Sequence, residues 1–280
     1  MSIDLHTHSS VSDGVDGPVA LMQLAADGGV DTIALTDHDT LDGIDAARSA
    51  AHGLGIDFIP GVELSVDHDG FKIHMLVYYV EPGEGPIQDR LAYLQAGRAE
   101  RNVKIVERLN ELGYEITMDD VRAQAKGPSV GRPHLADALI ERGYFPDRDS
   151  VFEDLLRDGG RAYFPRLRLS AVDAIALSRE GGGVPVIAHP ATIGATAEQY
   201  DQLFRELTAA GLGGIEAHHS MHDPALREHL TTVAHGLGIA ATGGSDYHGA
   251  GKRPYDLGVG AGDLRVPPSA LDELRRQQDR

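Results

Sequence analysis

The stretch Val30-Asp31-Thr32-Ile33-Ala34-Leu35 ends abruptly in Thr36-Asp37-His38-Asp39-Thr40. It is apolar enough to be buried on both faces, as expected for a strand of a parallel sheet that is covered by helices. In α/β barrels, functional side chains gather where such strands end. We therefore expect an α/β barrel with His38 at the functional edge of the sheet. Asp39 or Thr40 could instead cap the helix that follows.

Six further apolar, β-rich runs lie near residues 2–8, 57–66, 71–80, 184–189, 213–218 and 238–244. Most of the seven runs are separated by helix-like segments, such as 18–28, 40–54, 171–179, 197–210 and 224–237. This alternation predicts parallel strands with crossover helices, and 280 residues suffice for one large barrel. The Asp69-Gly70 pair is an exception, because it favours a hairpin that joins the third and fourth strands directly.

The alternation stops between the fourth and fifth strands, where the sequence becomes rich in Arg, Glu, Leu and Ala. Apolar residues recur there at helical spacing, and further helices are expected after Thr117 and Pro133. We therefore expect a barrel domain at residues 1–90 and 166–280, with a helical insertion, or lid, at 91–165 over the barrel mouth. The polar tail from Ser269 to Arg280 is typical of a terminal helix.

The composition limits the kinds of partner. No apolar run approaches the roughly 20 residues of a membrane span, and the N-terminus lacks a signal-like pattern, so we expect a cytoplasmic protein without membrane contact. A formal charge of −18 argues against binding long duplex nucleic acid but allows a small anionic substrate. No segment indicates an obligate protein partner. With no cysteine, any metal must be held by imidazole and carboxylate, which suits Mn²⁺, Fe²⁺ or Zn²⁺.

Histidines and carboxylates recur at the ends of the predicted strands. Asp4, His6 and His8 alternate along the first strand and so share one face, where Asp4 is better placed to orient a histidine than to bind metal. One such pair would be weak evidence, but ligand-type residues at so many strand ends indicate a centre with several cations. The predicted ligands are His6, His8, Asp13, His38, Glu63, His74, His189, Asp246 and His248.

At these positions the sequence resembles the PHP family, named for polymerase and histidinol phosphatase, whose members are metal-dependent phosphoesterases. The resemblance covers about residues 1–90 and 180–260 and implies a distorted seven-stranded (β/α) barrel with two to three divalent ions. Glu63 would then bridge two of the ions, which act on a water molecule. The resemblance implies one ion at His6, His8, Glu63 and Asp246, a second at Glu63, His74 and His189, and a third at Asp13, His38 and His248.

Within the insertion, the segment Gly131-Arg132-Pro133-His134 resembles the subgroup that acts on nucleoside 3′,5′-bisphosphates and short oligonucleotides. Because an arginine fork suits phosphate, we expect Arg132 and His134 to contact the substrate, although Arg132 could instead begin a helix in solvent. His218 ends the sixth strand and shares a face with Glu216 if the strand alternates regularly. It is therefore a candidate phosphate contact or general acid.

These features predict hydrolysis of a phosphate monoester of a small nucleotide. The preferred substrate is the 3′-phosphate of a nucleoside 3′,5′-bisphosphate, with AMP as a product and 5′-to-3′ trimming of short oligonucleotides as an added activity. One alternative is a phosphatase for a small metabolite such as histidinol phosphate. The others are an amidohydrolase and a non-catalytic metal-binding module, and the nine intact ligand positions argue against the last.

Overall fold

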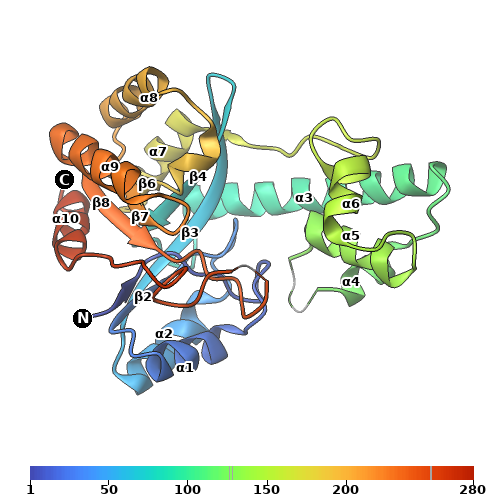
Figure 1. Cartoon of the computed structure of the whole chain (residues 1–280), viewed down its shortest axis with the longest axis horizontal. Coiled ribbons are helices and arrows are strands. Elements are labelled where there is room, and N and C mark those ends of the chain that lie inside the picture. Colours follow the sequence, from blue (N-terminus) through green and yellow to red (C-terminus); the bar gives the residue numbers. More distant parts are fainter. Residues whose placement is uncertain (126, 128, 253) are drawn as a thin grey trace.

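The protein is described here by a computed structural model that covers residues 1–125, 127, 129–252 and 254–280. A path of seven described strands forms a nearly closed barrel (Figure 1), and a short strand, β5 (Leu169–Ser170), pairs with β3. The barrel comes round on itself where the Leu5 N–H donates to the Gly243 carbonyl at 3.2 Å. The predicted seven-stranded α/β barrel is therefore confirmed. In path order the strands are β1 (Ile3–Asp4), β2 (Thr32–Leu35), β3 (Asp57–His68), β4 (Phe71–Tyr78), β6 (Val184–Ile187), β7 (Gly214–His219) and β8 (Ala240–Gly244).

The predicted hairpin is also confirmed. Strands β3 and β4 are antiparallel and are joined by Asp69 and Gly70, both with positive φ, while β4 is also antiparallel to β6. The other neighbours along the path pair in parallel. Two of the predicted ligands, Glu63 on β3 and His74 on β4, lie within strands, whereas the others follow the ends of strands.

Helices surround the barrel, as the alternating pattern predicted (Figure 1). Side-chain caps explain where several begin: Ser170, Thr196 and Asp223 each accept a hydrogen bond from a backbone N–H in the first helical turn. Their apolar faces pack on the outside of the sheet and form the largest hydrophobic cluster of the molecule. The helices of the barrel are α1 (Pro18–Asp27), α2 (Ile44–Leu54), α7 (Ala171–Glu180), α8 (Ala197–Ala209), α9 (Pro224–Leu237) and α10 (Ser269–Gln278), with a 3₁₀ turn η2 (Pro190–Ile193).

A long helix, α3 (Pro86–Glu111), connects the barrel to a separate helical unit (Figure 1). Leu91 and Leu94 at its start belong to the barrel core, whereas Ile105 and Leu109 belong to a second core inside the lid. The hydrophobic clusters thus divide α3 between Leu94 and Ile105, and the division of the chain at residues 90 and 165 stays a prediction. The lid also contains α4 (Met118–Ala123), α5 (Arg132–Glu141), α6 (Arg148–Val151) and a π-helical turn η1 (Phe152–Leu156).

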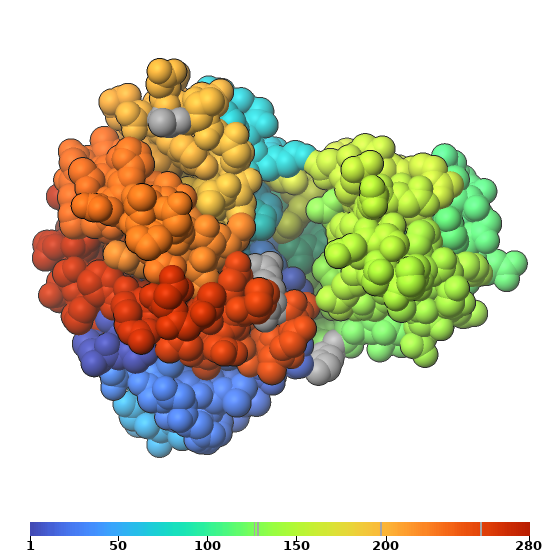
Figure 2. Space-filling view, in the orientation of Figure 1, coloured from blue at the N-terminus to red at the C-terminus, as the bar shows by residue number. Residues whose placement is uncertain are grey.

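The lid stands to one side of the barrel, and a hollow between the two is visible on the surface (Figure 2). The expected helix after Thr117 is confirmed, because Thr117 and Asp120 form a capping box at the start of α4. The helix that we expected around Pro133 is α5, with Pro133 in its first turn. Among the described residues, no helix is long and apolar enough to cross a membrane.

Candidate metal centre

Two imidazoles and two carboxylates converge at the end of β1. The Nε2 atoms of His6 and His8 lie 3.1 Å apart, and His6 Nε2 lies 3.3 Å from Glu63 Oε2 and 3.5 Å from Asp246 Oδ1. His6 Nδ1 contacts Glu216, so when Nδ1 donates to that carboxylate, Nε2 offers a lone pair. When acceptor atoms face one another with no proton between them, a bound cation stabilises the arrangement.

Glu63 is the centre of the cluster. Its Oε1 lies 2.8 Å from His74 Nδ1 and 3.1 Å from His189 Nε2, while its Oε2 lies 3.1 Å from both His8 Nε2 and His38 Nδ1. The side chain is fully buried on β3. One carboxylate with imidazoles on both oxygens has the geometry expected of a bridging ligand.

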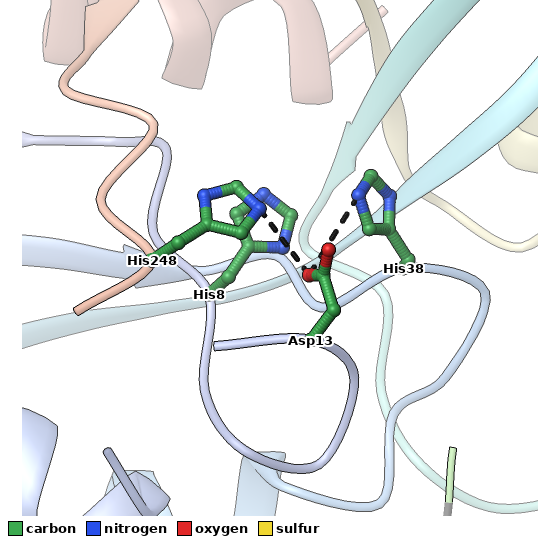
Figure 3. Close-up of side chains that lie close together, drawn as sticks. All are labelled: His8, Asp13, His38 and His248. Carbon is green, nitrogen blue, oxygen red and sulfur yellow. Dashed lines mark ion pairs between the residues drawn. The ribbon is translucent and has the colours of Figure 1, made fainter. Parts of the chain in front are cut away.

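A further group lies beside the first (Figure 3). Asp13 Oδ1 lies 3.2 Å from His248 Nε2 and 3.9 Å from His38 Nε2, and His8 completes the group. All four side chains offer ligand atoms within 4.8 Å of one another. The structure thus brings together every residue that the sequence predicted for the centre, although their roles as ligands stay a prediction.

The donor set fits divalent cations. The convergent atoms are imidazole nitrogens and carboxylate oxygens, which suit borderline and hard ions. Nδ1 of His8 is buried and has no hydrogen-bond partner in the described part of the chain. A buried polar atom without a partner requires an explanation, and a bound ion is a simple one in a cluster of this composition.

The electrostatics keep the Glu63 and Asp13 carboxylates ionised. Burial alone would raise the pKa of Glu63, but the imidazoles of His38, His74 and His6 outweigh it and hold the pKa well below its ordinary value. Burial opposes protonation of His8, yet hydrogen bonds to Asp246 and Glu63 prevail and raise its pKa to about 9. In the metal-free protein, protons therefore compete with cations for His8 at neutral pH.

Buried carboxylates behind the centre hold its ligands in place. Glu216 Oε1 lies 3.0 Å from His6 Nδ1, and Glu216 Oε2 accepts a hydrogen bond from the His189 backbone N–H at 2.6 Å. We expected Asp4 to orient a histidine, and it contacts His6 through the backbone N–H, which donates to Asp4 Oδ1 at 3.3 Å, rather than through the ring. Asp4 also accepts from the backbone and hydroxyl of Ser245 and from the Gly258 N–H, so it fixes the loop that carries Asp246.

Asp37 has a similar supporting role for the loop that carries Asp13. It accepts hydrogen bonds from the Ser9 N–H and from the hydroxyls of Ser9 and Ser12. Neither Asp37 nor Glu216 was identified as functional from the sequence. The available signal was an acidic residue inside or next to an apolar run, where an unpaired carboxylate would be costly.

The backbone is strained at several residues of the site. Asp39, His189 and Asp246 have φ values of 54°, 25° and 56° and follow the ends of β2, β6 and β8. Non-glycine residues seldom adopt this region, and they cluster at functional sites when they do. The strain therefore supports a functional reading of these three strand ends.

Asp39 joins the barrel to the lid and does not cap a helix. Helix α2 begins only at Ile44, with Gly43 before it, so the capping alternative was wrong. The Asp39 carboxylate instead pairs with Arg98 of α3 and with Arg166, which returns the chain to the barrel. Two partly buried guanidinium groups thus share one carboxylate next to His38.

A cavity of about 320 Å³ opens onto the cluster between barrel and lid. Its wall includes Glu63, His74 and His189 together with the cationic side chains of Lys72, Arg132 and Arg168. Asp158 pairs with Lys72 and lies 3.5 Å from Arg132, and Asp67 lies 3.5 Å from Arg168. Outside the cluster, the three cations of the wall therefore meet two carboxylates, while the other acidic residues of the lining, Glu63 and Asp246, belong to the cluster itself.

The two residues expected to contact substrate occupy different places. Arg132 lines the cavity next to the cluster, although it also begins α5 and donates to the Leu156 carbonyl. His134 lies in another cavity, beside Gly14 and Lys252, and its Nδ1 accepts a hydrogen bond from the Gly131 N–H at the helix start. Substrate contact by either residue stays a prediction.

The premise that selected His218 was wrong. A β-bulge interrupts the pairing of β7 with β8 between Glu216 and His218, so the strand does not alternate regularly there. His219, rather than His218, is buried against the His6 and His189 rings. The charges that act on His218 come from Arg227 and Glu273. A role for His218 as general acid is untested and stays a prediction.

The barrel with its cluster of convergent ligands defines a metal-dependent hydrolase. The PHP domain family matches residues 4–237, and the chain belongs to this family. It is 33% identical to the phosphoribosyl 1,2-cyclic phosphate 1,2-diphosphodiesterase of Eggerthella lenta, over 94% of this chain and 98% of that protein. It is 31% identical to the 3′,5′-nucleoside bisphosphate phosphatase of Chromobacterium violaceum (92% and 90%) and 32% identical to the 5′-3′ exoribonuclease of Haemophilus influenzae (88% and 89%).

Solved structures share the whole architecture. A metal-dependent phosphoesterase structure from Bifidobacterium adolescentis superposes with a TM-score of 0.86 at 33% identity, over 98% of this chain and 96% of the other. The activities named for these three curated relatives all break phosphoric ester bonds. The protein is therefore a metal-dependent phosphoric ester hydrolase, as the sequence predicted.

Proposed function

We propose that this enzyme removes the 3′-phosphate from nucleoside 3′,5′-bisphosphates and releases a nucleoside 5′-monophosphate such as AMP. The observation that carries the proposal is the cationic wall formed by Lys72, Arg132 and Arg168 in the cavity next to Glu63. In a chain of net charge −18, local positive charge of this kind selects an anionic substrate. A substrate with two phosphate groups can use the cluster and the wall together.

We further propose that the clustered side chains bind two to three ions of Mn, Fe or Zn. When bound, such ions lower the pKa of a coordinated water and offset charge that develops on the phosphoryl oxygens. The proposed grouping is the one that the family resemblance implies, and Glu63 would be shared between two ions. The first ion takes His6, His8, Glu63 and Asp246, the second takes Glu63, His74 and His189, and the third takes Asp13, His38 and His248. The first group is also a geometric cluster, whereas the cluster around Glu63 and His74 contains His38 in place of His189.

The protein's own groups position the reactants. Glu216 fixes the His6 ring so that Nε2 faces the cluster. Arg132 and Arg168 donate from the cavity wall to phosphate oxygens, and their planar forks can donate two parallel hydrogen bonds. The lid covers one side of the cavity, which favours a small substrate and limits the access of water.

The relative from C. violaceum, whose name specifies a nucleoside bisphosphate, supports this substrate. Trimming of short oligonucleotides from the 5′ end is an added activity that the exoribonuclease relatives support. A second candidate is hydrolysis of a cyclic phosphodiester of ribose, because the relative with that name matches 94% of this chain at 33% identity. None of the curated relatives named above acts on histidinol phosphate or an amide by name, but a solved structure from C. violaceum that superposes at 30% identity is named an amidohydrolase, so an amide stays an alternative substrate.

Release of inorganic phosphate tests the proposal, and for the cyclic phosphate, whose ring opening releases none, formation of the ring-opened monoester is measured instead. Protein loaded in turn with Mn²⁺, Fe²⁺ and Zn²⁺ is assayed with adenosine 3′,5′-bisphosphate, 5′-AMP, histidinol phosphate and a ribose cyclic phosphate. We expect the bisphosphate to give the highest kcat/KM and 5′-AMP to accumulate. The variant Glu63→Gln, whose metal content is measured in parallel, controls for contaminating phosphatases. A higher kcat/KM for the cyclic phosphate would select the second candidate instead.

A further inference from the structure

His219 ends β7 and is fully buried beside the centre. Its ring centroid lies 5.8 Å from that of His189 and 6.4 Å from that of His6, and the His6 and His189 centroids are 5.6 Å apart. The three rings thus form a compact triangle. His219 is not among the predicted metal ligands, so the burial of a third polar ring here needs its own explanation.

The hydrogen bonds of His219 fix the position of its proton. Nδ1 accepts from the Met221 backbone N–H at 3.1 Å, so a neutral ring must carry its proton on Nε2. Nε2 is buried and has no hydrogen-bond partner among the residues that the structure describes. Buried donors of this kind are rare in folded proteins and usually meet a ligand or an ordered water.

His219 is poorly suited to bind a metal ion itself. A ring nitrogen that carries a proton has no lone pair to offer, and Nδ1 is already occupied by the Met221 N–H. In the described part of the chain, His219 also belongs to none of the groups whose ligand atoms lie within 4.8 Å of one another. A neutral N–H donor beside a cationic centre suits an anionic oxygen instead.

We propose that His219 is a catalytic residue that donates a hydrogen bond from Nε2 to an oxygen of the phosphoryl group that is hydrolysed. The inference rests on the function proposed above, because it takes the substrate to be a phosphate ester. His189, which borders His219, also lines the cavity with Arg132. A phosphoryl group bound there would be contacted by Arg132 from the lid and by His219 from the barrel.

His222 provides a matched control. Its ring is also buried and lies 5.5 Å from that of His219. Both of its nitrogens are bonded to backbone, however, because Nδ1 donates to the Ala217 carbonyl at 2.9 Å and Nε2 accepts from the Ala191 N–H at 3.4 Å. It has no donor left for a substrate, so its replacement removes a buried histidine without removing the proposed contact.

Substitution of His219 by asparagine or by glutamine tests the roles of its two ring nitrogens separately. In His219→Asn the side-chain oxygen can still accept from the Met221 N–H, but the side chain is too short to donate from the Nε2 position. In His219→Gln the longer amide brings an N–H close to the Nε2 position. The proposed contact therefore predicts rescue by glutamine and not by asparagine.

Binding of inorganic phosphate, measured by titration calorimetry on protein of known metal content, gives a readout independent of turnover. We expect His219→Asn to weaken phosphate binding about 10-fold to 100-fold, as for loss of a hydrogen bond to a charged group. His219→Gln should stay within about threefold of wild type, and His222→Gln should lower only the melting temperature. The kcat for the bisphosphate should fall with phosphate affinity across the series.

The outcomes separate this inference from the proposed function. Unchanged phosphate affinity in His219→Asn would overturn the contact, and so would a loss of bound metal that accounts for the whole effect. If phosphate affinity falls as expected while no bisphosphate is hydrolysed by the wild type, the contact stands and the proposed substrate is wrong.

Discussion

The carboxylate of Glu216 offers a sharp test of how the centre is held. In Glu216→Gln, the amide oxygen can still accept from the His189 N–H, which lies 2.6 Å from Oε2 in the wild type. The amide nitrogen then faces His6 Nδ1, which must accept, so the His6 proton moves to Nε2. Nε2 is the atom that faces Glu63 and Asp246, and a protonated Nε2 cannot bind metal.

The expected magnitude follows from the lost charge-assisted hydrogen bond. Such a bond contributes about 1.5 to 3 kcal/mol, or about 10-fold to 150-fold in affinity. Measured effects of removing a residue behind a metal ligand are of the same size, about 10-fold to 100-fold. Competition with a chromogenic chelator measures this for Zn²⁺, and we expect the tightest site to weaken by one to two orders of magnitude.

Glu273 is the control, because its carboxylate makes the same two kinds of contact away from the centre. Glu273 lies 3.2 Å from His235 Nε2 and accepts a hydrogen bond from the Ala241 backbone N–H at 3.0 Å. Glu273→Gln should leave Zn²⁺ affinity unchanged. Metal affinities of Glu216→Gln and wild type within twofold of each other would show that Glu216 does not govern the His6 ring.

Three further predictions concern the competition of protons with metal ions for His8, the attachment of the lid and the cavity wall. Because the pKa of His8 is raised to about 9 in the metal-free protein, metal affinity should increase with pH up to about pH 9, and metal binding should release protons. Calorimetry in buffers of different ionisation enthalpy measures the affinity and the number of protons released. Absence of proton release at pH 7 would contradict the prediction. Asp39→Asn, a side chain that tolerates positive φ, removes the carboxylate that Arg98 and Arg166 both contact. The substitution should lower the free energy of unfolding by about 1.5 to 3 kcal/mol in urea titrations, whereas a loss under about 1 kcal/mol would refute the coupling. Arg132→Gln should raise KM for the bisphosphate about tenfold with metal content unchanged, and an unaltered KM would remove Arg132 from the substrate contacts.

The strands and the cluster could be predicted because both leave local signals. The apolar run of β2 stops at Thr36, and its polar continuation contains His38, so the strand, its end and the candidate ligand are readable together. The same holds for β6, which stops before His189. Helix bounds were predicted to within a few residues where a cap or proline marks the start, as with Pro18 and Pro224.

What escaped prediction depends on contacts between distant segments. The bulge in β7 breaks the alternation that favoured His218 and leaves His219 buried against His6 and His189, and no residue in the strand signals it. Whether Asp4 or Glu216 supports the His6 ring depends on how β1 and β7 face each other across the barrel, which a single sequence does not encode locally. The boundary between barrel and lid is hidden because α3 continues through both without a break.

The uninterrupted course of α3 makes the lid a lever. At 1.5 Å per residue the helix is about 39 Å long, and Gln95 and Arg98 tie its middle to Asp39. From the contact with Asp39 to Glu111, α3 extends about 20 Å. A tilt of the helix by about 10° about this contact therefore displaces its C-terminal end by about 3 Å. Small rotations beside His38 would thus be magnified into a change in the width of the cavity mouth.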